Sequence, residues 1–337
     1  MGEMVQGGID IYTTCPSAVG SGRDYLRRVE DVSRWSDQAG CKGILVYTDN
    51  RQADPWLIAH VIVQNSRSLT PLVAVQPIYM HPFAVAKAIS MFGWLYERDI
   101  FLNMVAGGFR GDLIALGDHT AHDERYERVT EYALIVHQLL AGRSPITFDG
   151  TYYSLKGLEL TPAPAPSRTA KMFTSGSSPA SLAAADAIGA TAISYPAPPG
   201  EQLGTDTAGG TRGVRIGIIA RQDSAAAWEV AHARFPADRR GQFAYALAAK
   251  SSDSRWFRGL STLQDGAYRG ASPYWTGPLR NSQSFCPYLV GSYTEVALEI
   301  ERYIGQGNRV FILDVPPSPE ELEHTASAFE HALRTTR

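Results

Sequence analysis

Short apolar segments alternate with amphipathic helical segments along most of the chain, and this alternation limits the possible folds more than any other feature. Strand-like segments are predicted at residues 7–14, 43–48, 69–77, 99–108, 171–176, 190–196, 213–221 and 308–315. Strands that alternate with helices indicate a parallel sheet. Eight such units without a doubly wound signature predict an α/β fold, a closed (β/α)8 TIM barrel, with an open eight-stranded sheet as the alternative.

Two stretches interrupt the alternation and are predicted to be insertions after the fourth and seventh strands. Residues 146–166 carry aromatic and β-branched residues around Asp149-Gly150, which predicts a hairpin. Residues 237–290 have weak periodicity and many Gly, Ser and Tyr residues, and their place after the seventh strand favours a lid. With these insertions, residues 1–337 are predicted to form a single barrel domain.

Composition excludes several classes of protein. The net charge is -3 and no basic block stands out, which argues against a nucleic-acid partner. No apolar stretch is long enough for a membrane span, and the N-terminus does not resemble a signal peptide. The three cysteines are far apart and odd in number, so they indicate neither a disulfide framework nor a metal site, and a cytoplasmic location is expected.

In a barrel, functional residues lie at the carboxyl ends of the strands. The stretches at these ends are Thr13–Cys15, Tyr47–Gln52, Val75–His81, Asn103–Gly108, Thr174–Ser178, Ser194–Pro196, Arg215–Arg221 and Asp314–Ser318. Among them, "FTSGSSPASL" (173–182) reads as a strand, a small polar turn and a helix that starts at Pro179. The free N–H groups of such a helix start suit a phosphate, although an ordinary serine N-cap explains the same residues.

The segment "GDHTAHDERYERVTEY" (117–132) has two interpretations that the sequence alone leaves open. Thr120 and Asp123 have the spacing of a capping box, and Glu124 and Arg128 have that of a helical ion pair, which predicts an ordinary helix start. Alternatively, side chains of the first turn reach an anion held at a neighbouring strand end. An ordinary helix start does not explain the glycine-rich turn before the segment, and the two interpretations stay open.

The order of these motifs resembles the bacterial luciferase-like flavin-dependent monooxygenases, nearest to their alkanesulfonate and pyrimidine monooxygenase subgroup. The resemblance rests on "LNMVAGG" (102–108), "HDERYERVTEY" (122–132), "FDGTYYSLKGLELTPAP" (148–164) and "FTSGSSPASLAAADAIGATAISYPAPP" (173–199), and covers residues 8–335. It implies a barrel that uses FMN, as FMNH2 from a separate NAD(P)H:flavin reductase. Oxygen would then react through a C4a-peroxyflavin to oxidise a small organic substrate. A homodimer or homotetramer is expected.

The resemblance also implies site residues. The expected cofactor-binding residues are Val75, Asn103, Ala106, His122, Arg125, Tyr126, Ser175, Gly176, Ser177 and Ser178. The residues expected to act in catalysis are His81, Gln52 and Arg215, and those expected to meet the substrate are Cys15, Tyr195 and Arg280.

Several positions depart from the pattern of this subgroup. Ala106 stands where the family has threonine, Gln52 where the sulfonate enzymes have cysteine, and Gly217 where they have a histidine. A simple alkanesulfonate is therefore not the expected substrate, and a role in specialised metabolism is favoured. Two alternatives remain: an F420-dependent oxidoreductase of the same superfamily, and a non-catalytic flavin-binding protein.

Overall fold

Eight parallel strands close into a barrel in the computed structural model, which describes residues 8–18, 20–164, 170–196, 198, 210–251, 260 and 272–335. The barrel strands are β1 (Asp10–Thr14), β2 (Gly43–Val46), β3 (Thr70–Val75), β4 (Phe101–Met104), β7 (Met172–Ser175), β8 (Thr191–Ser194), β9 (Arg212–Arg215) and β13 (Asn308–Ile312). Their order around the barrel is β1-β13-β9-β8-β7-β4-β3-β2. The predicted (β/α)8 barrel is confirmed, and the open sheet is excluded.

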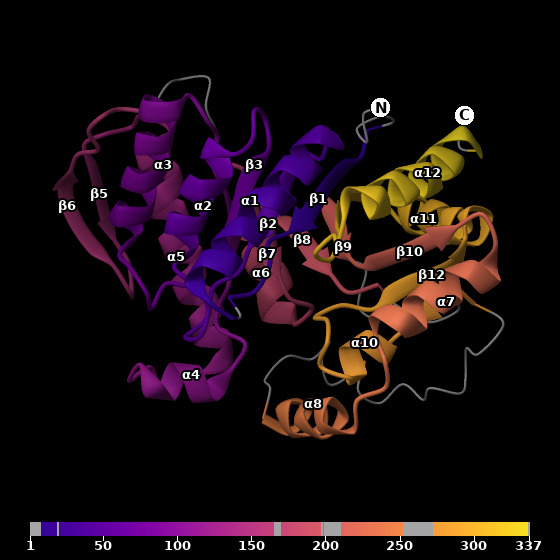
Figure 1. Cartoon of the computed structure of the whole chain (residues 1–337). Coiled ribbons are helices and arrows are strands. Elements are labelled where there is room, and N and C mark those ends of the chain that lie inside the picture. Colours follow the sequence, from indigo (N-terminus) through magenta and orange to yellow (C-terminus); the bar gives the residue numbers. More distant parts are fainter. Residues whose placement is uncertain are drawn as a thin grey trace.

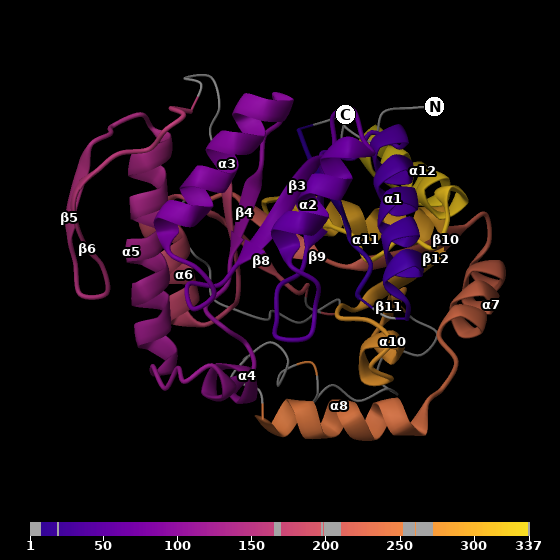
Figure 2. The ribbon, with the colours of Figure 1, turned by 60° about the vertical axis from the view of Figure 1, so that its left-hand side comes forward.

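Helices form the outer layer of the barrel (Figures 1 and 2). They are α1 (Gly22–Gln38), α2 (Pro55–Gln64), α3 (Pro82–Tyr96), α5 (His122–Leu140), α6 (Pro179–Ile188), α7 (Ser224–Arg234), α11 (Tyr293–Gly305) and α12 (Pro319–Thr335). Their starts are encoded locally: Asp54 accepts hydrogen bonds from the first N–H groups of α2, and Ser292 forms a capping box with Glu295 at α11.

Alternating residues of each strand point to opposite sides of the barrel wall. In β1, Ile11 packs outward with the helices, whereas Tyr12 points inward and meets the ring of Phe173 at 5.4 Å between centroids. The interior is a packed core of Tyr12, Leu45, Leu72, Phe101, Phe173, Ile193, Val310 and Ile312. A filled interior leaves the mouth at the carboxyl ends of the strands as the place for a ligand.

The seventh predicted strand, 213–221, is two strands. Residues up to Arg215 belong to β9 in the barrel, whereas β10 (Gly217–Arg221) joins a second sheet of order β10-β12-β11, with β11 (Tyr274–Trp275) and β12 (Tyr288–Ser292). The Ile216 N–H still bonds to Ile312 of the barrel, but the Gly217 N–H bonds to Pro287. Periodicity missed this break because both strands are apolar and only one residue separates them.

Both insertions contain regular structure. After β4 and α5, β5 (Ile146–Asp149) and β6 (Ser154–Leu158) form an antiparallel hairpin. The Glu131 carboxylate of α5 accepts hydrogen bonds from the backbone N–H groups of Thr151, Tyr152 and Tyr153 and fastens the hairpin tip.

The region 237–290 contributes α8 (Arg239–Ser251), β11, α10 (Gly277–Arg280) and β12. Its residues 252–259 and 261–271 lie outside the described part of the chain, so the lid stays a prediction. Figures 1 and 2 show α8 and α10, together with α4 (Arg110–Ala115), beyond the same end of the barrel. None of the helices in the described ranges is long and apolar enough to cross a membrane.

Candidate active site

The main pocket lies at the carboxyl ends of the strands and has a volume of about 220 Å³. Its wall comes from the ends of β2, β3, β4, β7, β8 and β9 and from the start of α5. The lining residues are Leu45, Tyr47, Thr48, Asp49, Gln52, Ala74, Gln76, Asn103, Val105, Ala106, Gly107, Gly108, Phe109, Asp112, His122, Tyr126, Ser175, Gly176, Ser177, Ser178, Tyr195, Arg215 and Phe285. Parallel strands thus bring residues far apart in sequence into one cavity.

One end of the pocket suits an anion. Ser178 caps helix α6 by accepting a hydrogen bond from the Ser181 N–H at 3.1 Å, and Pro179 occupies the first turn. The remaining N–H groups of this turn carry the positive end of the helix dipole. His122 and Tyr126 line the pocket from α5. Burial raises the pKa of the Tyr126 hydroxyl, which therefore stays protonated and able to donate a hydrogen bond.

Gly176 is packed too closely for any side chain. A Cβ atom built on it would collide with the Ser181 hydroxyl and would lie 2.9 Å from the Tyr126 hydroxyl. The missing side chain lets β7 and α5 approach each other and brings the backbone of the turn to the pocket wall. The glycine therefore shapes the anion-suited end.

The floor of the pocket is uncharged. The Ser175 hydroxyl donates a hydrogen bond of 3.0 Å to the amide oxygen of Asn103, linking the ends of β7 and β4. Ala106 and Gly107 continue the floor with little side-chain bulk, and Gly107 adopts φ +97° with the Gln76 side chain close by. Small residues and amides leave room for a flat ring system and offer it hydrogen bonds.

Arg215 ends β9, two strands from β7 in the barrel order, and lines the pocket. Its Nη1 donates to the hydroxyl of Tyr195 at 3.3 Å, and its guanidinium lies over the ring of Tyr47, 4.8 Å from the centroid. Only 8% of its surface is exposed. The Tyr47 ring in turn packs on Phe285, at 5.6 Å between centroids. This arrangement places a cation within an aromatic enclosure.

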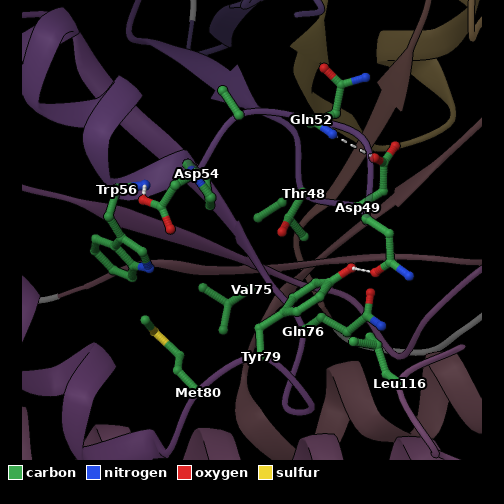
Figure 3. A pocket seen from close by; sticks show the side chains of 14 residues that line it. Thr48, Asp49, Gln52, Asp54, Trp56, Val75, Gln76, Tyr79, Met80 and Leu116 are labelled. Carbon is green, nitrogen blue, oxygen red and sulfur yellow. Dashed lines mark hydrogen bonds between the residues drawn. The ribbon is translucent and has the colours of Figure 1, made fainter. Parts of the chain in front are cut away.

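A second pocket of about 570 Å³ adjoins the first across the loop that follows β2. Thr48, Asp49, Gln52, Ala74 and Gln76 line both pockets. Figure 3 shows Trp56 and Met80 on one side and Asp49 and Gln52 on the other. The loop is held by the Asp49 carboxylate, which accepts from the Gln52 N–H at 2.9 Å. The shared wall makes the two pockets adjoining compartments at the barrel mouth.

The start of α5 differs from the predicted capping. Ala121 is the N-cap, and the Glu124 carboxylate accepts from its N–H. Thr120 instead donates its hydroxyl to Asp118, and Arg128 pairs with the same carboxylate at 2.5 Å. Sequence spacing favoured local partners within the helix, but Asp118 in the preceding turn competes for both. The helix start is fastened by Asp118, which leaves His122 and Tyr126 facing the pocket.

Most of the predicted site residues meet in the main pocket. Gln52, Asn103, Ala106, His122, Tyr126, Ser175, Gly176, Ser177, Ser178, Tyr195 and Arg215 all line it. Val75 lines only the adjoining pocket. Gln52 also accepts a hydrogen bond from the Ala18 N–H through its side-chain oxygen. This group was found because each member follows a predicted strand or begins the next helix.

Four further predicted residues line neither pocket. His81 is the N-cap of α3, where its Nδ1 accepts from the Phe83 N–H at 3.2 Å. Cys15 is buried among core residues between barrel and helices, and its burial raises the pKa of the thiol to about 12. Arg125 is buried behind the helix start, with Nη1 donating to the Thr120 carbonyl. Arg280 ends α10, outside the lining.

Two aromatic residues of the lining escaped sequence reasoning. Phe109 follows the predicted strand-four segment, and Phe285 belongs to the region of weak periodicity. Both are partly exposed, at 44% and 47%. Neither lies at the end of a strand, so the strand-end rule did not select them. A partly exposed large aromatic beside a cavity is a signal that only the structure supplies.

Comparison with known proteins assigns this barrel to a protein family. Residues 6–309 match the luciferase-like monooxygenase family. The chain belongs to the luciferase-like monooxygenase family. It is 31% identical over 309 residues, 90% of each chain, to the 4-(gamma-L-glutamylamino)butanoyl-[BtrI acyl-carrier protein] monooxygenase BtrO of Niallia circulans. The chain is therefore an enzyme, and the resemblance inferred from its motifs is confirmed.

Two solved structures with a similar fold support the barrel architecture. Long-chain alkane monooxygenase LadA superposes with a TM-score of 0.70 at 15% identity, covering 98% of this chain and 91% of that one. An F420-dependent secondary alcohol dehydrogenase superposes with a TM-score of 0.66 at 16% identity, covering 96% and 99%. Because these identities are low, the two structures support the fold and leave the cofactor open.

Proposed function

We propose that the chain is the oxygenase component of a two-component FMNH2-dependent monooxygenase, which uses O2 to oxidise a small organic substrate. The observation that carries the proposal is the pocket with an anion-suited end on α6 and α5 and an uncharged floor on β4 and β3. FMN has the matching parts, a phosphate at one end and a flat ring system at the other. Bound reduced flavin supplies the reactivity toward O2 that no amino-acid side chain has.

The lining residues match the parts of this cofactor. Gly176 brings the backbone of the turn to the pocket wall, where Ser177, Ser178 and Tyr126 offer hydroxyls to phosphate oxygens. The amide groups of Asn103 and Gln76 face the floor, where they would orient the polar edge of the ring. Phe109, Phe285 and Tyr47 would shield the reacting ring from water, which favours oxygen transfer over loss of peroxide.

The substrate and the partner follow from the same proposal. The Niallia circulans relative is named for an acyl group on an acyl-carrier protein. A carrier-bound acyl chain is therefore the first substrate class to test, consistent with a role in specialised metabolism. A separate NAD(P)H:flavin reductase would deliver FMNH2, as a two-component monooxygenase requires.

Anaerobic rapid mixing tests the proposal without a known substrate. The protein, in excess over FMNH2, is mixed with oxygenated buffer, and flavin absorbance is followed. Bound reduced flavin is expected to reoxidise at a rate that depends on protein concentration and differs from that of free FMNH2. The same rate with and without protein, together with no binding of FMN or FMNH2 at tens of micromolar, would refute the proposal.

A further inference from the structure

Three polar atoms in the wall of the main pocket have no hydrogen-bond partner among the described residues. They are Nε and Nη2 of Arg215 and the hydroxyl of Tyr47. Leaving buried polar groups unpaired is unfavourable, and a charged donor is the most unfavourable case. Buried polar groups in native structures nearly always have a partner, so three unpaired atoms in the wall of one pocket point to a ligand that binds there.

The two unpaired nitrogens of Arg215 specify the shape of that ligand. Nε and Nη2 lie on the same edge of the planar guanidinium, and the third nitrogen is held by Tyr195 at 3.3 Å. Two parallel N–H groups on one edge match the two oxygens of a carboxylate. Within the described ranges, no carboxylate forms an ion pair with Arg215, and the pocket-lining Asp49 instead accepts hydrogen bonds from the backbone of its own loop.

The position of Arg215 separates this ligand from the flavin phosphate. In the closed barrel order, β8 separates β9 from β7, and the β1–β13 pair separates β9 from β2. The contact of Arg215 with Tyr47 therefore spans the mouth from β9 to β2, away from the serine turn after β7. One FMN has one phosphate, so an anion at the Arg215 end comes from a second molecule.

We propose that Arg215, with Tyr195 and Tyr47, binds a carboxylate group of the substrate. The inference rests on the flavin pocket proposed above and adds the chemical class of the substrate to it. Nε and Nη2 are covered in this conformation, so a side chain at the mouth moves when the carboxylate enters. Phe285 packs on Tyr47, is 47% exposed and lines the same pocket.

Calorimetric titration of the full chain with glutarate and with its neutral diamide, glutaramide, tests the inference, with FMN present and absent. Wild type is expected to bind glutarate at least about 10-fold more tightly than glutaramide. Arg215→Met is expected to lose about 10- to 100-fold in glutarate affinity and little in glutaramide affinity. Arg110→Met removes the same charge from the exposed start of α4 and is the matched control, expected to bind like wild type.

Circular dichroism establishes that each variant folds, and Tyr195→Phe offers a second, milder test because it frees Nη1 without removing the charge. Equal affinity for glutarate and glutaramide, equal loss in both arginine variants, or no binding of any carboxylate from acetate to adipate at millimolar concentration would overturn the inference. Equally tight binding of sulfate would also overturn it, because Arg215 would then bind anions in general. FMN affinity, measured separately, reports on the flavin proposal, so the two fail independently.

Discussion

Arg128 and Asp118 form a 2.5 Å ion pair that ties helix α5 to the turn before it, with side chains only 14% and 3% exposed. Asp118 also accepts hydrogen bonds from the N–H and the hydroxyl of Thr120. Asp118→Asn removes the charge and is expected to lower the free energy of unfolding at neutral pH by about 2–3 kcal/mol. FMN affinity should fall as well, because α5 carries His122 and Tyr126 into the pocket. Urea unfolding and flavin titration measure the two effects.

The same pair predicts a pH dependence. Burial pushes the pKa of Asp118 up, but hydrogen bonds from Arg128 and Thr120 outweigh it and hold the pKa at about 2, below the ordinary 3.8. A carboxyl whose pKa is lower in the folded state stabilises above its unfolded pKa and loses that contribution as the pH falls. The stability difference between wild type and Asp118→Asn should therefore shrink from pH 3.8 toward 2. A difference that stays constant over this range would contradict the assignment.

Gly176→Ala tests the close approach of α5 to the turn at residues 175–178, which is proposed to bind the phosphate. The new methyl group would collide with Ser181 and crowd the Tyr126 hydroxyl, so the turn must shift. FMN affinity is expected to fall by about 10-fold or more, since misplaced donors forfeit charge-assisted hydrogen bonds. Gly111→Ala is the control, because a Cβ atom there meets nothing within 4 Å. Fluorescence quenching of FMN gives both affinities; equal values would show that the turn does not hold the cofactor.

Ser177→Asp tests which part of the flavin lies at the start of α6. A carboxylate beside the helix N-terminus should repel the phosphate of FMN and leave riboflavin, which lacks that phosphate, much less affected. The ratio of FMN to riboflavin affinity is expected to drop by about 10-fold or more. Ser177→Asn, of similar size and no charge, is the matched control. A parallel loss for both flavins would place the phosphate elsewhere.

Glu321 links three elements outside the lining of the main pocket. Its carboxylate binds Arg221 of β10 and Arg234 of α7, the latter at 2.8 Å, and is 11% exposed. Glu321→Gln is expected to lower the free energy of unfolding by about 2–4 kcal/mol, because two largely buried arginines lose their counter-charge. Glu330→Gln, on the exposed face of the same helix, should change it by less than about 0.5 kcal/mol. FMN affinity should remain that of wild type in both.

The sequence revealed the barrel and the anion-suited end because both depend on local patterns. Apolar runs marked the strands, and Gly176, Ser177 and Ser178 stand together where a strand meets a helix start. Contacts between segments that are distant in sequence determined the features that the patterns did not predict. Asp118 took Thr120 and Arg128 from their predicted partners within the helix, and the Gly217 N–H changed sheets. His81 has a local capping partner that a strand-end rule does not foresee.

The substrate end of the pocket could be predicted only in part. Arg215 was selected because it ends a strand. The sequence did not show that its Nε and Nη2 lack a partner, nor that it contacts Tyr47 after β2, because β9 and β2 are distant in sequence. Phe285 comes from a region without periodicity and reaches the pocket through the second sheet. Such contacts depend on how the second sheet sits on the barrel, which no pattern within either segment encodes.

The most direct measurement is an anaerobic titration of the protein with FMNH2 and, separately, with reduced F420. The account predicts that FMNH2 binds at least about 10-fold more tightly than reduced F420. Tighter binding of reduced F420 would contradict the account and make the chain an F420-dependent oxidoreductase. Binding of neither cofactor would refute the proposal that this pocket holds a flavin.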